Sequence, residues 1–264
     1  MKNNKPKAVV LRTAGTNCDA ETVYALQLVG ADVDLVHINQ LFHQEVKLDD
    51  YKILVIPGGF SYGDDVASGK ILANELRYKL YQPLKKFVKA GKLALGICNG
   101  FQVLVKCGLL PGYEIFDQEQ LTTLTFNDSG KFEDRWVYLK KMPSNCVFTK
   151  DLPETIYLPV AHGEGKFISK NEQIFARIVQ EEQVVFQYVD ENGKEVGYPG
   201  NPNGSQNGIA AISNPAGNVM GMMPHPERYV SRLQHPRWTR EDLPEEGVGL
   251  TIFRSAVKYA KEKL

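Results

Sequence analysis

Short apolar runs and amphipathic stretches alternate along the first hundred residues. Val23, Leu26 and Val29 recur at helical spacing and predict a helix over residues 16–29. A second, longer helix is expected over residues 71–90, with Gly91 as its C-cap. Runs of apolar and β-branched residues predict four strands, over residues 8–11, 33–36, 53–56 and 92–97. Strands that alternate with helices predict an α/β fold with a mostly parallel central sheet flanked by helices.

The second half of the chain has short apolar runs separated by turn-forming segments. Strands are predicted over residues 122–126, 136–139, 183–188 and 209–212. Strong turn signals at residues 190–193 and 201–204 suggest an antiparallel portion that shares the same core. Residues 250–263 are amphipathic and predict a closing helix. Because no repeat or linker interrupts the chain, a single domain over residues 1–264 is expected.

Composition and charge exclude some classes of function. The 264 residues are 43% apolar, enough for a full core, and their 31 basic and 31 acidic residues balance. Without a block of like charge, binding to nucleic acid or to an anionic membrane is not expected. Residues 1–7 lack the apolar region of a signal peptide, and no run of about 18–20 apolar residues could span a bilayer. A cytoplasmic protein that acts on a small polar substrate or binds a protein partner fits these features.

Any cysteine with a function in this chain is expected to be a reduced, reactive thiol. The four cysteines show no C-x-x-C spacing, which argues against a structural metal site, and no metal or other cofactor is predicted: Cys18, Cys98, Cys107 and Cys146.

Cys98 has the most informative setting of the four. It lies between a predicted strand and a predicted helix, with Gly96 two residues before it and Gly100 two residues after it. This is the G-x-nucleophile-x-G elbow with cysteine as nucleophile, in which a Cβ at either glycine would meet the neighbouring strand or helix. The sulfur would stand at a helix N-terminus, where the macrodipole favours the thiolate. Cys98 is therefore the candidate nucleophile, whereas the other three cysteines are interpreted as buried apolar residues.

A second glycine-rich segment, residues 57–59, follows another predicted strand. Acyl transfer from an amide passes through an oxyanion, which needs two hydrogen-bond donors. We assign these donors to the backbone amides of Gly59 and of Asn99, the residue after the nucleophile. A Pro-Gly-Gly turn alone is a weak signal, but beside a nucleophile elbow it becomes informative.

The chain contains five histidines, and two of them have a carboxylate two residues further on. His225 precedes Glu227, and in an extended segment both side chains would lie on one face. His225 is the predicted base, and Glu227 the residue that orients the imidazole ring. His162, which precedes Glu164, is the competing candidate and is interpreted as a supporting or substrate-facing residue.

In this chain order, the Pro-Gly-Gly loop, the G-x-C-x-G-x-Q elbow and the late His-x-Glu resemble those of a class I glutamine amidotransferase. The resemblance runs from about Val9 to Ala260 and implies a flavodoxin-like α/β fold. It also implies that Gln102, the glutamine of the elbow motif, contacts the amino-acid end of bound glutamine.

Further segments resemble one branch of this family, which supplies ammonia to an ATP-dependent carbon–nitrogen ligase of purine biosynthesis. They include residues 15–19, 58–64, 162–165, 201–205 and 223–228. The implied partners are an ATP-binding synthase subunit and, in separate-chain systems, a small accessory subunit. The stretch 231–246 is more similar to the end of the fused, large form. ATP chemistry is expected on another chain, because neither G-x-x-x-x-G-K-[ST] nor G-x-G-x-x-G occurs here.

Three alternatives stay open at this point. An amidotransferase of another synthase is disfavoured by the Phe-Ser-Tyr-Gly-Asp segment at residues 60–64. A stand-alone cysteine hydrolase or peptidase on the same fold would be active without a partner. A binding or regulatory protein without activity would have no chemical need for Cys98, His225 and Glu227 together.

Overall fold

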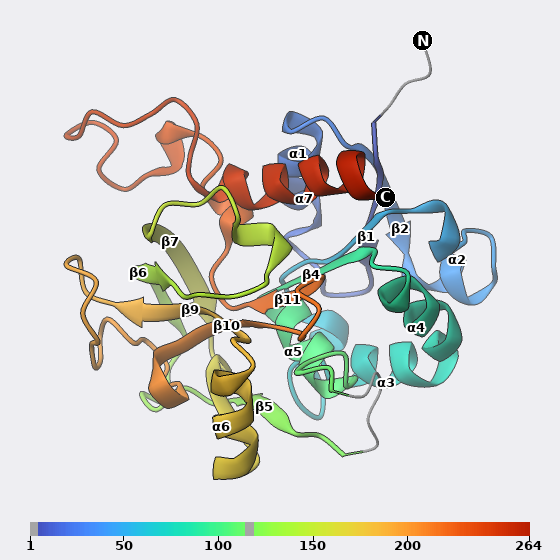
Figure 1. The fold of residues 1–264 in the computed structure, drawn as a ribbon, viewed down its shortest axis with the longest axis horizontal. Helices are drawn as coiled ribbons and strands as arrows, with labels where there is room; N and C mark the ends of the chain where they lie inside the picture. Colours follow the sequence, from blue (N-terminus) through green and yellow to red (C-terminus); the bar gives the residue numbers. More distant parts are fainter. Residues whose placement is uncertain (1–4, 114–118) are drawn as a thin grey trace.

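A computed structural model describes residues 5–113 and 119–264 of the chain; residues 1–4, at the start of the segment examined for a signal peptide, lie outside this range. Within the described residues, one sheet of nine strands runs through both halves of the molecule (Figure 1). In spatial order its strands are β2 (Asp32–His37), β1 (Lys7–Arg12), β3 (Ile53–Ile56), β4 (Leu93–Ile97), β11 (Val219–Met222), β10 (Ile209–Ser213), β9 (Val184–Val189), β6 (Glu133–Lys141) and β7 (Thr155–His162).

The first five strands of this order, from β2 to β11, pair in parallel. Every residue of β3, β4 and β11 is buried, as expected for the centre of a sheet covered on both faces, whereas the edge strand β2 has a single buried residue, Val36. Helices α1 (Asp19–Leu28) and α7 (Gly249–Lys263) lie on one side of these strands, and helices α3 (Lys70–Lys79), α4 (Tyr81–Lys89) and α5 (Asn99–Lys106) lie on the other (Figure 1). The predicted parallel sheet with flanking helices is therefore confirmed.

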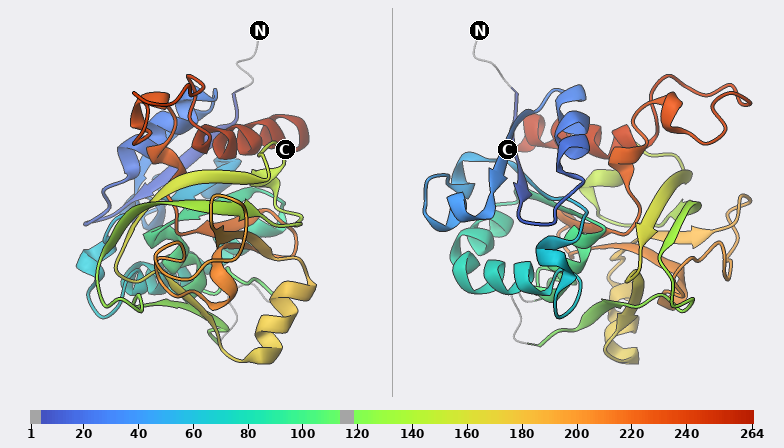
Figure 2. Two further views of the ribbon diagram at one scale, coloured as in Figure 1. Left: turned by 90° about the vertical axis from the view of Figure 1, so that its left-hand side faces the viewer. Right: turned by 180° about the vertical axis from the view of Figure 1, so that it is seen from behind.

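The remaining strands, β10, β9, β6 and β7, pair antiparallel and continue the same sheet. They lie together on the side of the molecule away from β2 and α2 (Ile38–Phe42), as Figure 2 shows. A second, two-stranded sheet joins β5 (Thr122–Thr125) to β8 (Lys166–Ser169). The antiparallel portion expected from the turn-rich second half is thus confirmed.

The prediction of one helix over residues 71–90 is wrong. The structure contains two helices, α3 and α4, which meet at Leu80, a residue with φ −119° and ψ 16°. Pro83 explains the break, because a proline has no amide hydrogen and its ring would collide with the carbonyl of Lys79 in a continuous helix. Pro83 is tolerated in the first turn of α4, where amide groups have no intrahelical acceptor.

Several elements were not predicted from the sequence, namely α2, β7, β8, β11 and α6 (Glu172–Gln180). Strand β11, with the sequence Val-Met-Gly-Met, is too short for a periodic signal, yet it extends the parallel region beside β4. The closing helix over residues 250–263 was predicted correctly. No helix in the described part of the chain has the length and apolar character needed to cross a membrane.

Candidate active site

The candidate site lies where the carboxyl ends of four parallel strands meet. Cys98 follows β4, residues 57–59 follow β3, residues 13–18 follow β1, and His225 comes three residues after β11. The loops are joined directly, since the amides of Asn17 and Cys18 donate to the carbonyl of Gly58 at 3.4 and 3.2 Å. Ligands of parallel sheets bind at this edge. The fold therefore brings together segments that are more than 200 residues apart in the chain.

Cys98 occupies a strained turn between β4 and α5. Its backbone has φ 51° and ψ −106°, a conformation that residues other than glycine rarely adopt. A Cβ at Gly100 would overlap the carbonyl oxygen of Ile56 in β3, and one at Gly96 would overlap the carbonyl of Gly100. The turn thus has the geometry of a nucleophile elbow, for the steric reason that the sequence suggested. The sulfur is almost buried and lies 3.6 Å from the carbonyl oxygen of Ala161.

His225 and Glu227 form a close buried pair. His225 Nδ1 lies 2.6 Å from Glu227 Oε1, and the two residues are 1% and 0% exposed. The expected extended segment is wrong, because Pro226–Arg228 forms a 3-10 turn that begins after His225. The turn still brings the two side chains together. His225 Nε2 and Glu227 Oε2 have no hydrogen-bond partner among the described residues, so Nε2 is free to act on another group.

The imidazole of His225 is close to Cys98 as well as to Glu227. A Cβ built on Gly58 would lie 2.8 Å from His225 Cε1 and 3.5 Å from Cys98 Cβ, so only a glycine leaves room between them. Burial alone would lower the pKa of His225, but the charges of Glu227 and Cys98 outweigh it and raise the pKa well above its usual value. The site therefore favours an imidazolium ion beside the sulfur of Cys98.

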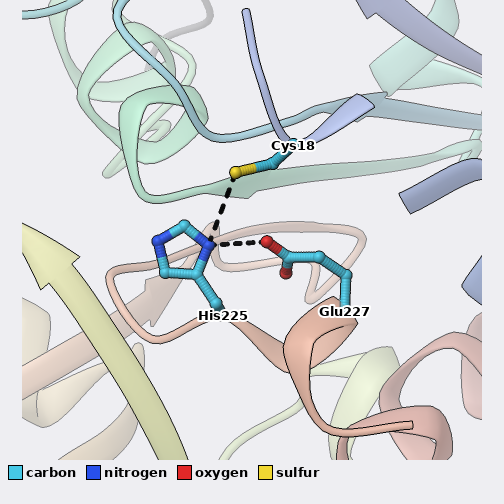
Figure 3. Close-up of side chains that lie close together, drawn as sticks. All are labelled: Cys18, His225 and Glu227. Atoms are coloured by element: carbon cyan, nitrogen blue, oxygen red, sulfur yellow. Dashed lines mark hydrogen bonds and ion pairs between the residues drawn. The ribbon is translucent and has the colours of Figure 1, made fainter. Parts of the chain in front are cut away.

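Cys18 is the site residue that sequence reasoning missed. It was interpreted as a packing residue, and it is fully buried, but its Sγ lies 3.9 Å from His225 Nδ1 (Figure 3). The guanidinium of Arg228 donates to the same sulfur at 3.1 Å. Burial raises the pKa of Cys18, which keeps it a neutral thiol despite the opposing effect of His225. Cys107 and Cys146 are packing residues, because burial raises the pKa of each to about 12.

Within the described residues, Cys18, His225 and Glu227 could also offer one metal-ligand atom each, and these atoms lie within 4.8 Å of one another. The positive guanidinium of Arg228 beside Cys18 disfavours a cation at this position. Glu227 is already engaged by His225. The arrangement therefore fits a hydrogen-bonded catalytic group better than a metal site.

The two amides predicted as oxyanion donors belong to Gly59, which lines the same cavity as Cys98, and to Asn99, the residue after Cys98. No described residue accepts a hydrogen bond from the amide of Gly59, which lines the same cavity as Cys98. Asn99 begins α5, where the first amide groups lack intrahelical acceptors. Both amides are thus available to a ligand, as acyl-transfer chemistry requires.

The side chains of Asn99 and Gln102 tie α5 to the loop after β3 and to the loop after β7. Asn99 Oδ1 accepts from the amide of Ser61 at 3.2 Å, and its Nδ2 donates to Gln102 Oε1 at 2.9 Å. Gln102 Nε2 donates to the carbonyl of Glu164 at 2.5 Å. Gln102 also lines the cavity beside Cys98, the position that the family resemblance implies.

His162, the competing histidine, is held as a neutral ring. Nδ1 lies 3.1 Å from Asn127 Oδ1, and Nε2 lies 3.4 Å from Asn203 Nδ2, so both nitrogens are engaged. Burial, with the nearby charge of His225, lowers the pKa of His162 to about 3. A ring with no free nitrogen and no affinity for a proton is poorly suited to be a base. This placement fits the supporting or substrate-facing role inferred from the sequence.

A cavity of about 160 Å³ opens above these residues. Its lining residues come from the loop after β3, from Cys98 and α5, from the end of β7 and the loop after it, and from the segment between β5 and β6: Gly59, Phe60, Asp64, Ser68, Cys98, Gln102, Phe126, Phe132, Ala161, His162, Gly163 and Glu164. A cysteine elbow, a buried His–Glu pair and two free amides beside a cavity define the class of cysteine-dependent amidohydrolases built on an open α/β sheet.

Comparisons with known proteins agree with this class. The family model of the CobB/CobQ-like glutamine amidotransferase domain matches residues 5–260. A relative from Dehalococcoides mccartyi, named phosphoribosylformylglycinamidine synthase subunit PurQ, is 48% identical over 98% of this chain and 99% of its own. A relative of the same name from Treponema denticola is 42% identical over 97% of this chain and 99% of its own.

A solved structure gives the same result. A chain in the structure named PurLQS from Thermotoga maritima has a TM-score of 0.73 and 35% identity, over 97% of this chain and 99% of the other. The chain therefore belongs to the CobB/CobQ-like glutamine amidotransferase family, in the branch of the phosphoribosylformylglycinamidine synthase subunits. The family resemblance found in the sequence is confirmed. The stretch 231–246, which resembles the end of the fused form, lies within the match to relatives that are named as subunits.

Proposed function

We propose that this chain is the glutaminase subunit of phosphoribosylformylglycinamidine synthase. It hydrolyses glutamine and passes the ammonia to an ATP-dependent synthase subunit, within the carbon–nitrogen ligase reaction of purine biosynthesis. The placement of His225 carries the proposal, because its ring lies beside Cys98, one nitrogen is paired with Glu227 at 2.6 Å, and the other is buried and has no hydrogen-bond partner among the described residues. Full-length relatives that share the subunit name support the same assignment.

Cys98 is the nucleophile in this proposal, and His225 is the base. Transfer of the thiol proton to His225 Nε2 gives the imidazolium ion that the site favours, and the resulting thiolate attacks the γ-carbonyl carbon of glutamine. The amides of Gly59 and Asn99 stabilise the oxyanion, each donor being worth about 10²–10³ in rate in other enzymes. Collapse of the tetrahedral intermediate breaks the carbon–nitrogen bond, and His225 protonates the departing ammonia. Water then hydrolyses the γ-glutamyl thioester, with His225 as base again, to give glutamate and free Cys98.

Glu227 orients the imidazole and supports its positive charge. Its carboxylate accepts the Nδ1 hydrogen, which presents Nε2 to the substrate side. Because Glu227 is fully buried, its interaction with the imidazolium is little screened by solvent.

The synthase partner binds, in this proposal, at the mouth of the cavity. Phe60, Phe126 and Phe132 line the cavity and are nevertheless 44%, 71% and 53% exposed, which is unusual for large apolar side chains. Partner residues that cover these rings would shield the cavity from water and receive the ammonia. We extend the proposal to a small accessory subunit in the same assembly, as the family resemblance implies, and to action in the cytoplasm.

Trapping the intermediate tests this proposal. A glutamine analogue that carries an electrophile in place of the amide should label Cys98 covalently, as found by peptide mass spectrometry. Labelling should require His225 and should be prevented by excess glutamine. Labelling of Cys18 or Cys107 instead of Cys98 would contradict the assignment.

A further inference from the structure

We propose that Asp64 and Glu164 form the subsite that binds the α-ammonium group of glutamine. This inference rests on the proposed glutaminase function and adds the groups that select the amino-acid end of the substrate. Both side chains line the cavity that contains Cys98. They are brought to it by different segments, the loop after β3 and the loop after β7.

The spacing of residues along α5 gives an estimate of the length of the cavity. Gln102 and Lys106 are four residues apart and lie on the same side of this helix, and Cys98 is the residue directly before it. At 1.5 Å per residue, Gln102 lies about 6 Å along the axis from Cys98. Extended glutamine spans about 5 Å from its amide carbon to its α-nitrogen, over four bonds of about 1.5 Å. A substrate whose amide carbon contacts Cys98 therefore has its amino-acid end at the level of Gln102.

Asp64 and Glu164 are near that level. Asp64 Oδ1 accepts from Asn99 Nδ2 at 3.0 Å, and the carbonyl of Glu164 accepts from Gln102 Nε2 at 2.5 Å. Among the described residues that line the cavity, Asp64 and Glu164 are the two with carboxyl side chains, and none is a lysine or an arginine. His162, the other titratable ring there, is neutral because its pKa is lowered to about 3. The cavity thus selects a ligand with a positive charge.

The two carboxylates are fixed in place before any ligand binds. Asp64 Oδ2 accepts from the hydroxyl of Ser68 at 2.9 Å, and Oδ1 also accepts from the amide of Gly69 at 3.3 Å. Below them, the buried ammonium of Lys106 donates to the carbonyl of Ser68 at 2.5 Å and lies 3.9 Å from Glu164 Oε2. One buried lysine therefore lies beside Glu164, and the negative charges of Glu164 and Asp64 both act on it.

The charge balance of this cluster favours a second cation. Burial raises the pKa of Asp64, hydrogen bonds from Ser68 and Gly69 oppose the rise, and the negative charge of Glu164 adds to it. An ammonium group in the cavity would relieve the repulsion between the two carboxylates. His225 Nε2, buried and without a partner, marks the opposite, amide-binding end of the ligand. The ligand that fits has a primary amide at one end and an α-ammonium group at the other.

The test compares glutamine with glutaramate, which has the same amide and carboxylate but a hydrogen in place of the α-ammonium group. Wild type, Asp64→Asn and Glu164→Gln are assayed in complex with the synthase for kcat/KM on both substrates. Loss of a hydrogen bond to a charged group should lower kcat/KM for glutamine about 10–100-fold. The value for glutaramate should change less than threefold. Asp65→Asn, an exposed neighbour outside the cavity, is the matched control and should leave both values unchanged.

An equal loss on both substrates, or no loss on either, would overturn the inference. The rate at which iodoacetamide alkylates Cys98 shows whether a variant keeps an intact site. If one of the two variants fails this check, the other still tests the inference. Failure of the proposed function gives a different result, because wild-type protein in the complex would then show no glutamine-dependent reaction at all. That result would remove the inference together with the function on which it rests.

Discussion

His225 Nδ1 lies 2.6 Å from Glu227 Oε1 in a pocket that leaves both residues essentially without solvent contact. The carboxylate raises the pKa of a ring that burial alone would keep neutral. The pair therefore stabilises the imidazolium ion that forms when His225 takes the proton of Cys98, and this would leave a thiolate that can attack an unactivated amide.

The two members of this pair should contribute unequally to glutamine hydrolysis. We expect His225→Ala to abolish measurable activity, because it removes the proton acceptor. Glu227→Gln should retain more, since it removes only the orienting charge, although comparable changes elsewhere cost about 10⁴ in kcat. Steady-state kcat for glutamine is the measurement. His162→Ala serves as the comparison, and an equally damaging effect there, with the fold intact, would contradict this ranking.

His162 should make stability depend on pH. Its pKa is lowered to about 3 in the folded chain, against about 6.5 when unfolded. The unfolded state therefore binds this proton at higher pH, so the stabilising contribution is fully present above about pH 6.5 and is lost as the pH falls toward 3. Between pH 7 and pH 5 the loss is on the order of 2 kcal/mol.

Urea unfolding at pH 7 and pH 5 measures this loss. The decrease in the free energy of unfolding should be about 2 kcal/mol smaller in His162→Gln than in wild type. His43→Gln, a change at an exposed histidine, is the control and should keep the wild-type decrease. Identical pH dependence in wild type and His162→Gln would argue against a neutral, buried His162.

Cys18 should position His225 and Arg228 without forming the thioester. Cys18→Ala would leave the guanidinium of Arg228 without its sulfur acceptor beside the imidazole, so we expect kcat for glutamine to fall about tenfold, the worth of one such hydrogen bond. Cys18→Ser keeps an acceptor and should retain more activity. Cys107→Ala is the control, because Cys107 is also buried but its thiol donates to the carbonyl of Leu104 and not to a group of the site. A γ-glutamyl group found on Cys18 would exclude the positioning role.

The isolated chain should be a poor glutaminase that its partner activates. Gly59 has φ +138°, and its amide is one of the two predicted oxyanion donors. A peptide flip at residues 58 and 59 costs little because both are glycines, and it would remove this donor, at about 10²–10³ in rate. We expect kcat to rise by about that factor when the synthase, loaded with its substrate and nucleotide, is added. Equal rates with and without the partner would favour a stand-alone hydrolase.

Local signals in the sequence were sufficient for four of the five parallel strands and for the sharp turn at Cys98. Strand 53–56 was predicted with its observed bounds, and the elbow glycines at 96 and 100 have the steric role inferred for them. Helix 71–90 was mispredicted because helical periodicity continues through Leu80, whereas Pro83 interrupts the hydrogen bonding.

Contacts between distant segments could not be predicted from local patterns. Cys18 and His225 are 207 residues apart in the chain, and only the order of the strands makes them neighbours. The pairing of His225 with Glu227 was predicted for the wrong reason, since a 3-10 turn and not an extended segment joins them. The engagement of both nitrogens of His162 by Asn127 and Asn203 likewise depends on loops that carry no periodic signal.

Substitution of Cys98 tests the central claim most directly. Cys98→Ala, assembled with the synthase subunit, should lose all glutamine-dependent product formation and keep the wild-type rate when ammonium salt replaces glutamine. This result would place the chemistry of ammonia release on Cys98 and the ATP-dependent step on the partner. Survival of the glutamine reaction, or loss of both reactions together in a correctly assembled complex, would contradict the account.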